Sequence, residues 1–386
     1  MAQFNNNSIN LTKKLSKQTK KDQGIYFTPN DLVEKCVNSA LNDDFKPKNI
    51  LEPSCGSGQF IDYLTFLNFN DLTGIELNKD IFNTLPKGNF INDDFLKHNF
   101  KNIKFDLIIG NPPYYVLPKR DVNKEYYQFF EGRPNIYILF IIKSLELLNP
   151  EGVLSFILPV NFLNCFYYNQ LRFHIFHNYV ILDISIHEST FEDTEQKVCI
   201  FTVKNVHNYK MNDIFTIIRY GTILFNTKIN IKLICELYGD SMILDNFDTE
   251  IHVGTVVWNQ VKNLLTDDAS KTLLIYSSDI SKDGNYSKVK SKNLAKKGYI
   301  DKKGVTGEIL VLNRGYGKGD YSFNWCLLNL EQEYLIENHL ITISSPNIQK
   351  IMESFKNPQT KKFIELVFGN NQINIQELLF ILPIYL

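Results

Sequence analysis

The residues with the clearest chemical potential form the run Asn111-Pro112-Pro113-Tyr114, which directly follows the apolar segment FDLIIG. The two prolines fix φ, carry no backbone N–H and hold the residue before each of them extended. The side-chain oxygen of Asn111 and a proline carbonyl can then accept both hydrogens of an aromatic exocyclic amine and direct its lone pair toward an electrophile. Tyr114 could stack on the ring, an interaction worth about 1 to 3 kcal/mol per base. The alternative is a Pro-Pro turn with a core tyrosine.

A second group of residues has the features of a nucleoside pocket. In ILEPSCGSGQF, Gly56 and Gly58 let the backbone approach a ligand, and the amides that start the next helix can receive a polar group. Glu76 ends the following strand, LTGIEL, where a carboxylate can bind both ribose hydroxyls. Asp94 in NDDFL could accept from an adenine amine while Phe95 packs on the ring. Singly these are ordinary turn residues, but together they predict a pocket for an adenosine-bearing cofactor.

The elements that must position these residues follow an alternating pattern. A helix is predicted to begin in TPNDLVEKCVNSAL, with Thr28 as N-cap, Pro29 at the first helical position and Asp31 three residues after the cap. From there to about Lys204, short apolar runs alternate with helical patterns, which predicts an α/β sheet with helices on both faces. Beyond that point the pattern is mixed, so we place a domain boundary near residue 205.

The composition narrows the classes of protein that remain. The 386 residues predict two domains, and a hydrophobic content of 44% with 22% charged residues excludes a disordered chain, collagen and coiled coil. Because 41 basic residues balance 42 acidic ones, any surface for nucleic acid must be a local patch. The six cysteines show no C-x-x-C pair or metal-ligand spacing, so we expect reduced thiols and no metal. No signal peptide or membrane span is recognisable, which predicts a cytoplasmic protein.

The ordered motifs resemble those of the gamma-group, N-P-P-Y type DNA adenine-N6 methyltransferases of restriction-modification systems. The matching segments are GIYFTP (24–29), LEPSCGSGQF (51–60), GIEL (74–77), NDDFL (92–96), NPPY (111–114), NIYILF (135–140) and EGVLSFILPVNFL (151–163). The resemblance implies a Rossmann-like class I S-adenosylmethionine-dependent methyltransferase sheet. It divides the chain into a basic N-terminal tail (1–23), a catalytic domain (24–204) and a mixed α/β target-recognition domain (205–386).

The same resemblance assigns roles to individual residues. It implies that the methionine end of S-adenosyl-L-methionine is held by Thr28 and by the turn that contains Glu52, Pro53, Ser54, Cys55, Gly56 and Gly58. Glu76 would bind the ribose, Asp94 and Phe95 the adenine, and Asn111 and Pro113 would also border the cofactor. Asn111 and Pro112 would bind the target amine, and Tyr114 would stack on the flipped base. Phe191, in STFEDTEQKVCIF, matches the family's second base-stacking aromatic, although a core phenylalanine is an equally good interpretation.

The partner implied by the resemblance is double-stranded DNA. Eight lysines lie between Lys282 and Lys303 with two aspartates and two tyrosines, a composition suited to phosphate contacts, although a solvated loop has the same composition. Arg314, in VLNRGYGKGD, could read a base edge or form a surface ion pair. The residues that we expect to contact DNA are Lys288, Lys290, Lys296, Lys297 and Arg314. We expect a monomer that acts alone or beside a separate restriction endonuclease, in a bacterial cytoplasm or, for a viral enzyme, inside the host cell.

Two other functions stay open at this stage. A protein-glutamine N5 methyltransferase shares the Gly-rich turn and the N-P-P-Y run, because a side-chain amide presents a similar planar nitrogen. Such enzymes resemble a sheet domain with a small helical domain before it, whereas some 180 residues follow the predicted sheet here, which favours DNA. A non-catalytic DNA-binding relative is the other alternative, but the chain retains every motif residue that the chemistry needs.

Overall fold

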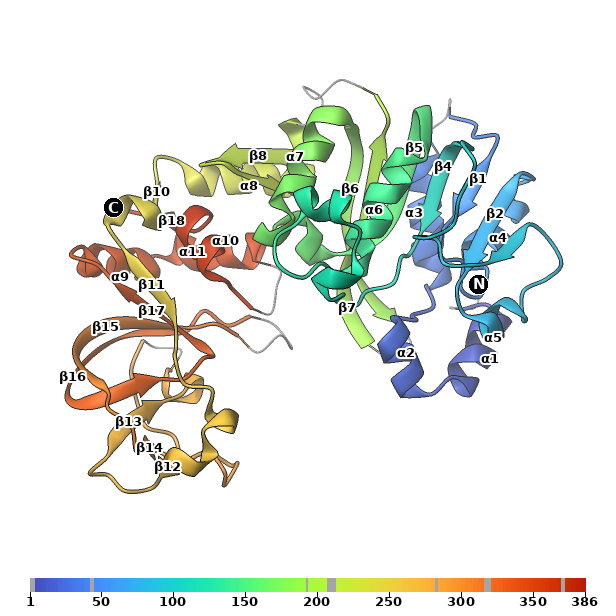
Figure 1. The fold of residues 1–386 in the computed structure, drawn as a ribbon. Helices are drawn as coiled ribbons and strands as arrows, with labels where there is room; N and C mark the ends of the chain where they lie inside the picture. The colour runs from blue at the N-terminus through green and yellow to red at the C-terminus, as the bar shows by residue number, and fades with distance from the viewer. Residues whose placement is uncertain are drawn as a thin grey trace. The chain divides into compact units, whose positions relative to one another are not determined.

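The structure is a computed structural model that describes residues 4–41, 45–191, 194–206, 213–281, 284–315, 321–368 and 372–386. The chain divides into two compact units (Figure 1). Unit 1 contains Met1–Ile218 and Ile223–Ile231, and unit 2 contains Arg219–Thr222 and Lys232–Leu386. Residues 205–231, which the sequence pattern places in the second domain, are therefore shared between the two units.

Unit 1 is built on a seven-stranded sheet with the order β3-β2-β1-β4-β5-β7-β6. The strands are β1 (Ile50–Glu52), β2 (Leu72–Glu76), β3 (Phe90–Asn92), β4 (Phe105–Gly110), β5 (Leu148–Pro159), β6 (Val180–Phe191) and β7 (Thr194–Lys204). The first five are parallel, and β7 runs antiparallel between β5 and β6. Because the strand order reverses beside β1, the carboxyl ends of β1, β2 and β4 meet at the edge where ligands bind in such sheets. The predicted Rossmann-like α/β sheet is confirmed.

Helices cover both faces of this sheet, as the pattern of apolar residues predicts (Figure 1). The helices of unit 1 are α3 (Asn30–Ala40), α4 (Gln59–Phe66), α5 (Lys79–Phe82), α6 (Ile136–Glu146) and α7 (Asn169–Asn178), with α1 and α2 before them. Alternate residues of β4 point to opposite faces: Leu107 and Ile109 pack with α3 and α4, whereas Ile108 packs with α6 and α7. The α6 helix is buried along nearly its whole length, because it lies inside the larger of the two cores.

The start of α3 differs from the prediction. The N-cap position is occupied by Pro29, whose side chain makes no capping hydrogen bond, and Thr28 lies one residue outside the helix. Thr28 is therefore not the cap, and its hydroxyl accepts a hydrogen bond from Asn111 instead. The Thr28 hydroxyl, which the local sequence assigns to the helix end, bonds to a residue that is distant in the sequence.

The first residues of the chain, which the sequence describes only as a basic tail, contain two helices, α1 (Asn6–Lys14) and α2 (Lys17–Gln23). Side chains of Asn5 and Ser16 cap them. Phe4 and Leu11 pack with Phe27 and Ile81 in a small cluster of their own. These residues are part of the folded unit.

Unit 2 is a mixed α/β body. Its main sheet has the order β11-β17-β15-β16-β13-β14-β12, and β10 (Met242–Ile243) pairs with β18 (Pro383–Ile384). The strands of the main sheet are β11 (Glu250–Val253), β12 (Leu265–Thr266), β13 (Thr272–Ile275), β14 (Tyr299–Ile300), β15 (Val305–Asn313), β16 (Trp325–Ile336) and β17 (Leu340–Ser344). Its helices include α9 (Ile348–Lys356), α10 (Pro358–Val367) and α11 (Ile375–Phe380). The remaining elements, β8 (Thr216–Arg219), β9 (Thr222–Phe225) and α8 (Lys228–Tyr238), lie where the chain passes from one unit to the other.

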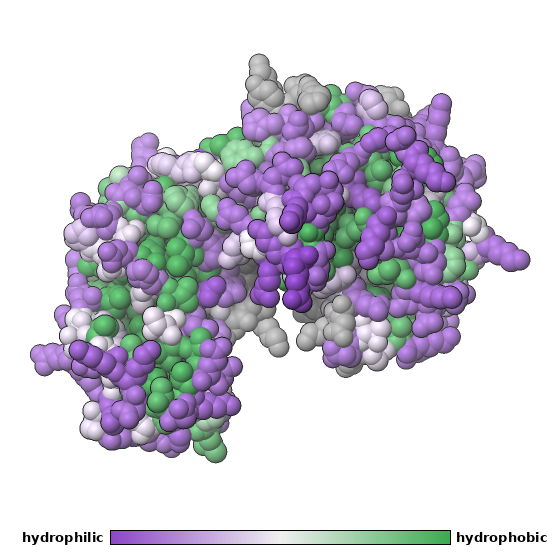
Figure 2. Space-filling view, in the orientation of Figure 1, coloured by the Kyte–Doolittle hydropathy of each residue, from purple (hydrophilic) through white to green (hydrophobic). Residues whose placement is uncertain are grey.

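The surface of each unit is mainly hydrophilic, with hydrophobic side chains showing between polar ones (Figure 2). None of the helices in the described ranges has the length and apolar character that crossing a bilayer requires.

Candidate active site

The polar residues predicted from the sequence meet at one edge of the unit 1 sheet. Glu52 ends β1 opposite Gly74, and Glu76 ends β2 opposite Asn92, so both carboxylates lie at the carboxyl ends of parallel strands. Asn111 directly follows Gly110, the last residue of β4, which pairs with β1 on the other side. The topology thus brings together residues that are up to 60 positions apart in the sequence.

Asn111 is held by hydrogen bonds from three sides. Its Nδ2 donates to Oγ1 of Thr28 at 3.1 Å, and its backbone carbonyl accepts from the hydroxyl of Ser54 at 3.2 Å. The Tyr114 hydroxyl donates to Oδ1 of Asn111 at 2.5 Å. The contact to Thr28 connects the run that follows β4 with the segment before α3, and the contact to Ser54 connects it with the Gly-rich turn. Asn111 therefore has a fixed orientation beside that turn.

Tyr114 is anchored through its hydroxyl while its ring is only partly buried. The hydroxyl lies 2.7 Å from the carbonyl oxygen of Ile157 as well as 2.5 Å from Asn111. Burial of the hydroxyl raises the pKa of Tyr114 well above its ordinary value, so the phenol keeps its proton. The ring meets Tyr137 edge-on, with 5.9 Å between centroids. The Tyr114 hydroxyl thus has two acceptors in reach and can donate its proton to either of them.

The Gly-rich turn is hydrogen-bonded to the side chain of Glu76. Gly56 donates its N–H to Oε2 of Glu76 at 2.9 Å, and the N–H of Asn78 donates to Oε1 at 2.6 Å. Gly56 and Gly58 have φ of 51° and 85°, a region that favours glycine. Glu76 is 7% exposed, and burial raises its pKa while the two backbone donors lower it. The carboxylate therefore fixes the Gly-rich turn to the end of β2.

Glu52 has a buried carboxyl group with one oxygen that has no hydrogen-bond partner. The side chain is 2% exposed, and its Oε2 has no hydrogen-bond partner. Burial, followed by the nearby Asp62 and Glu76, raises the pKa of Glu52 well above its ordinary value. An unpaired carboxylate oxygen of this kind costs about 1 to 3 kcal/mol or more, which a cationic ligand group would offset. The site therefore fits the ammonium group of S-adenosyl-L-methionine, and Pro53, Ser54 and the buried Cys55 form the turn around it.

Asp94 and Phe95 have partners of their own. Asp94 accepts from the N–H of Leu96 at 3.0 Å, and Lys97 approaches its carboxylate at 3.0 Å. Phe95 is 2% exposed, and its ring packs against Phe140 with 4.9 Å between centroids. In the structure Phe95 is a core residue beneath the strand ends, and its contact with a cofactor stays a prediction.

Leu77 is a residue of this edge that the sequence reasoning missed. It directly follows Glu76, and 60% of its surface is exposed. An apolar side chain left in solvent beside the Glu76 carboxylate has the character that the flat face of an adenine requires. The signal was present in the sequence as the apolar residue after the acidic strand end, GIEL.

Phe191 is the last residue of β6 and pairs with Thr194 of β7. Its side chain lies outside the described part of the structure, so its role beside a flipped base stays a prediction.

In unit 2, three of the predicted DNA-binding lysines have partners within the unit. Lys288 lies 3.3 Å from Asp279, a fully buried carboxylate, and burial lowers the pKa of Lys288. Lys297 forms an ion pair with Asp267 at 2.7 Å. Lys296 lies over the rings of Trp258 and Tyr276, 5.2 and 4.8 Å from their centroids.

Lys290 is exposed. Arg314 follows the end of β15, and its Nε is buried without a hydrogen-bond partner. DNA contacts of all five predicted residues stay predictions.

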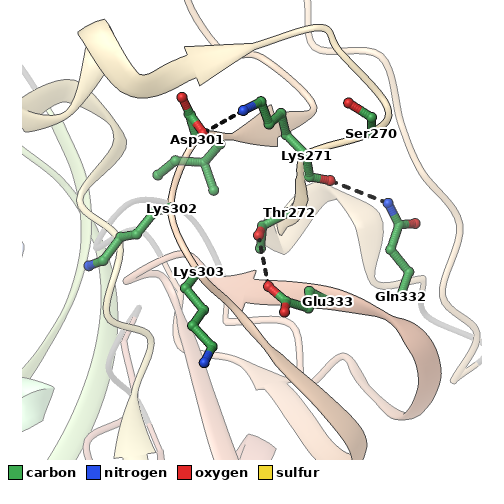
Figure 3. A pocket seen from close by; sticks show the side chains of 9 residues that line it. Ser270, Lys271, Thr272, Asp301, Lys302, Lys303, Gln332 and Glu333 are labelled. Carbon is green, nitrogen blue, oxygen red and sulfur yellow. Dashed lines mark hydrogen bonds and ion pairs between the residues drawn. The ribbon is translucent and has the colours of Figure 1, made fainter.

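A hollow of about 580 Å³ in unit 2 offers two further lysines (Figure 3). Lys271 pairs with Asp301 at 2.8 Å, and Glu333 accepts from Thr272 at 3.4 Å. Lys302 and Lys303 are exposed and extend away from these pairs (Figure 3). Among the described residues, no group of three His, Cys, Asp or Glu side chains could hold a metal ion.

Comparison with known proteins finds a matching family model and similar chains. A family model described as Eco57I restriction-modification methylase matches residues 6–191. The chain is 28% identical to the Type II methyltransferase M.CvrRI of Paramecium bursaria Chlorella virus XZ-6E, with 97% of each chain covered. It is also 28% identical to the modification methylase CviBIII of Paramecium bursaria Chlorella virus NC1A, again with 97% of each chain covered.

Among solved structures, the Type I restriction enzyme EcoKI M protein superposes with a TM-score of 0.38 and 16% identity, over 47% of this chain and 44% of that chain. The family match and the relatives support a DNA methyltransferase of restriction-modification type. The fold is that of a class I methyltransferase, and its cofactor is S-adenosyl-L-methionine.

Proposed function

We propose that this protein transfers a methyl group from S-adenosyl-L-methionine to the exocyclic N6 amine of adenine in a short duplex DNA motif. The observation that carries the proposal is the position of Asn111. Its acceptor oxygens lie beside the Gly-rich turn, fixed by Thr28 and Ser54, at the strand edge that also holds Glu52 and Glu76. Methyl acceptor and methyl donor would therefore meet at one edge.

The amine would be bound by Oδ1 of Asn111 and the carbonyl of Pro112. In the structure Oδ1 accepts from Tyr114, but the Tyr114 hydroxyl has a second acceptor in the carbonyl of Ile157, 2.7 Å away. The hydroxyl can turn to Ile157 when the amine arrives, so Oδ1 is released without leaving a buried O–H unpaired. Two acceptors would draw the amine hydrogens out of the plane of the ring, so that the nitrogen lone pair leaves ring conjugation and is directed toward the methyl donor.

S-adenosyl-L-methionine supplies an electrophilic methyl group on a sulfonium. Glu52, Thr28 and the turn would hold its methionine end, Glu76 the ribose hydroxyls, and Leu77, Asp94 and Phe95 the adenine. Positioning of the two reactants supplies most of the rate acceleration in such a displacement. No strong general base is required, because the amine becomes acidic once it is methylated.

The target adenine must leave the duplex before its amine can meet the donor in line. Extrusion costs a few kcal/mol, which stacking on Tyr114 and contacts with the DNA backbone would offset. Phe191 is our candidate for the second stacking ring.

Methylation of a ring carbon needs a thiolate that attacks the base. The run after β4 that we propose to bind the base, GNPPYY, contains no cysteine. An exocyclic amine that already carries a lone pair needs no such nucleophile.

We assign catalysis to residues 24–204 and target recognition to residues 205–386. Lys290, Lys296, Lys297 and Arg314 are the proposed DNA contacts, to which we add the exposed Lys302 and Lys303. Lys288 was also expected to contact DNA, but its pairing with the buried Asp279 favours a structural role. The protein would act as a monomer, inside a cell, either beside a separate restriction endonuclease or as an orphan methylase.

The decisive experiment is transfer of a labelled methyl group from S-adenosyl-L-methionine to unmethylated genomic DNA, followed by nucleoside mass spectrometry and single-molecule sequencing. We expect N6-methyladenine confined to one short motif. N4-methylcytosine would replace the base assignment while leaving the amine chemistry intact. Label that enters a protein extract and not DNA would overturn the proposal in favour of a protein-glutamine methyltransferase.

A further inference from the structure

We infer that the N-terminal segment, residues 4–24, is a working part of the cofactor site, with Ser8 as a positioning residue that holds the Gly-rich turn. The inference rests on the proposed function only through its cofactor, S-adenosyl-L-methionine. The motifs that carry the sequence resemblance begin at residue 24, and the family model that matches residues 6–191 covers this segment without assigning a role to its residues.

Ser8 makes the central contact. Its side chain is 0% exposed, and its hydroxyl oxygen lies 2.7 Å from that of Ser57, between Gly56 and Gly58. The Ser8 hydroxyl also donates to Oδ1 of Asn5 at 2.7 Å, and Nδ2 of Asn7 donates to the carbonyl of Ser57 at 3.3 Å. Helix α1 therefore binds both the side chain and the backbone of the turn that receives the cofactor.

The hydrogen bonds continue from Ser57 to the catalytic asparagine. The Ser57 hydroxyl has one proton, which it donates either to the Ser8 oxygen or to Oε1 of Gln59, 3.3 Å away. Nε2 of Gln59 donates to the carbonyl of Thr28. Oγ1 of Thr28 accepts from Asn111 at 3.1 Å. Because Ser57, Gln59 and Thr28 are all buried, breaking any of these hydrogen bonds leaves a polar group without solvent to replace its partner.

The end of the N-terminal segment contacts the loop after Glu76 and the N-P-P-Y run. Nδ2 of Asn78, which follows the ribose-side strand end, donates to Oε1 of Gln23 at 2.9 Å. Gly24 has φ of 61°, and a Cβ at this position would lie 2.9 Å from the backbone nitrogen of Tyr114. The chain therefore passes against the N-P-P-Y run with room for glycine alone.

One short segment thus fixes the Gly-rich turn, the loop after Glu76 and the base-binding run. A ligand that needs these three loops in place binds more tightly when the segment is docked, and by linkage it stabilises the docked segment to the same extent. Cofactor affinity and order of the N-terminal segment are therefore coupled.

The test is isothermal titration of S-adenosylhomocysteine into the full-length protein and its Ser8→Ala and Asn10→Ala variants. Asn10 lies on the exposed face of the same helix and is the matched control. We expect Ser8→Ala to weaken binding between about threefold and tenfold, the equivalent of one hydrogen bond, and Asn10→Ala to leave it unchanged. Steady-state methylation should show a raised KM for S-adenosyl-L-methionine with kcat within about twofold of the wild type, a split that general destabilisation would not produce.

Protection from trypsin measures the reciprocal effect, even where Ser8→Ala folds poorly. In the wild-type protein, saturating S-adenosylhomocysteine should slow cleavage after Lys13 and Lys14 severalfold, while cleavage after Lys361 in unit 2 should not change. Equal affinity of Ser8→Ala and wild type, together with cleavage that ignores the ligand, would overturn the inference. Absence of any binding to the wild type would instead count against the proposed function.

Discussion

The strand edge of unit 1 and the lysine-rich segment of unit 2 are both rich in polar residues, yet they differ in what the polar groups do. At the strand edge, Glu52 keeps an unpaired buried oxygen and Asn111 has an acceptor that Tyr114 can release. In unit 2, Lys288 and Lys297 already pair with Asp279 and Asp267. A site for a ligand is marked by buried groups whose partners are missing or exchangeable, and not by the number of charges.

The largest effect that this comparison predicts comes from Asn111→Ala. Removal of the side-chain acceptor should lower kcat for DNA methylation by about 10² to 10³, the range seen when one preorganised transition-state contact is removed. S-adenosylhomocysteine affinity should stay within a few fold, since the cofactor groups remain. The exposed Asn89 provides the control, Asn89→Ala. A collapse of cofactor affinity in Asn111→Ala would show that the division of roles at the edge is wrong.

A Glu52→Gln substitution tests the unpaired oxygen. Burial raises the pKa of Glu52, so the folded state holds this proton more tightly than the unfolded state does. The associated stability is present at low pH and is lost as pH rises through the raised pKa. At pH 8 the ligand-free Gln variant should therefore be more stable, by roughly 1 to 3 kcal/mol, while binding S-adenosylhomocysteine more weakly. Urea unfolding at pH 5 and pH 8 measures the difference, and a variant less stable than wild type at pH 8 would refute this assignment.

A Thr28→Val substitution removes the hydroxyl that accepts from Asn111 and keeps the shape of the side chain. The Asn111 amide would lose the acceptor for its Nδ2, so we expect kcat to fall about tenfold, the equivalent of about 1 to 1.5 kcal/mol. Thr28→Ser retains the hydroxyl and should restore most of the rate. If Val and Ser variants were equally active, Thr28 would not orient the asparagine.

The smallest effect concerns DNA affinity in unit 2. Replacing the exposed Lys302 and Lys303 by Gln should lower the slope of log K against log salt by about 0.9 for each phosphate that a lysine no longer binds. Lys288→Gln should instead lower the unfolding midpoint, because it leaves Asp279 buried without its cation. Salt titrations of DNA binding and thermal unfolding separate the two outcomes. A Lys288→Gln variant with normal stability and a reduced salt slope would return that lysine to the DNA surface.

Features that depend on a short local pattern could be predicted from the sequence, whereas contacts between distant residues could not. The α/β sheet, the strand-end carboxylates and the Asn111 run were predictable because each depends on a short local pattern of apolar strand and turn. Thr28 was predicted to cap α3, but the local pattern cannot show that Asn111, 83 residues away, takes its hydroxyl. The two N-terminal helices were missed because a polar, lysine-rich stretch has few apolar residues to mark a buried face. Their stability comes from contacts with Ser57 and Ile81.

The partners of the lysines in unit 2 were not predictable for a related reason. Whether Lys288 faces solvent or Asp279 depends on how β13 and the segment before β14 pack, which no spacing in the sequence encodes. Arg314 and Phe191 remain hypotheses, since neither has a distinctive local pattern.

The path of the chain between the units has a consequence for how such enzymes can diversify. The chain enters unit 2 at Arg219, returns to unit 1 at Ile223 and leaves it only after Ile231. Phe215, Ile223 and Phe225 lie in the main core of unit 1, and Arg172 donates to the carbonyl of Ile223 at 2.8 Å. A genetic exchange that joined a foreign segment at residue 205 would remove part of the core of unit 1. An exchange that falls after residue 231 would leave that core intact.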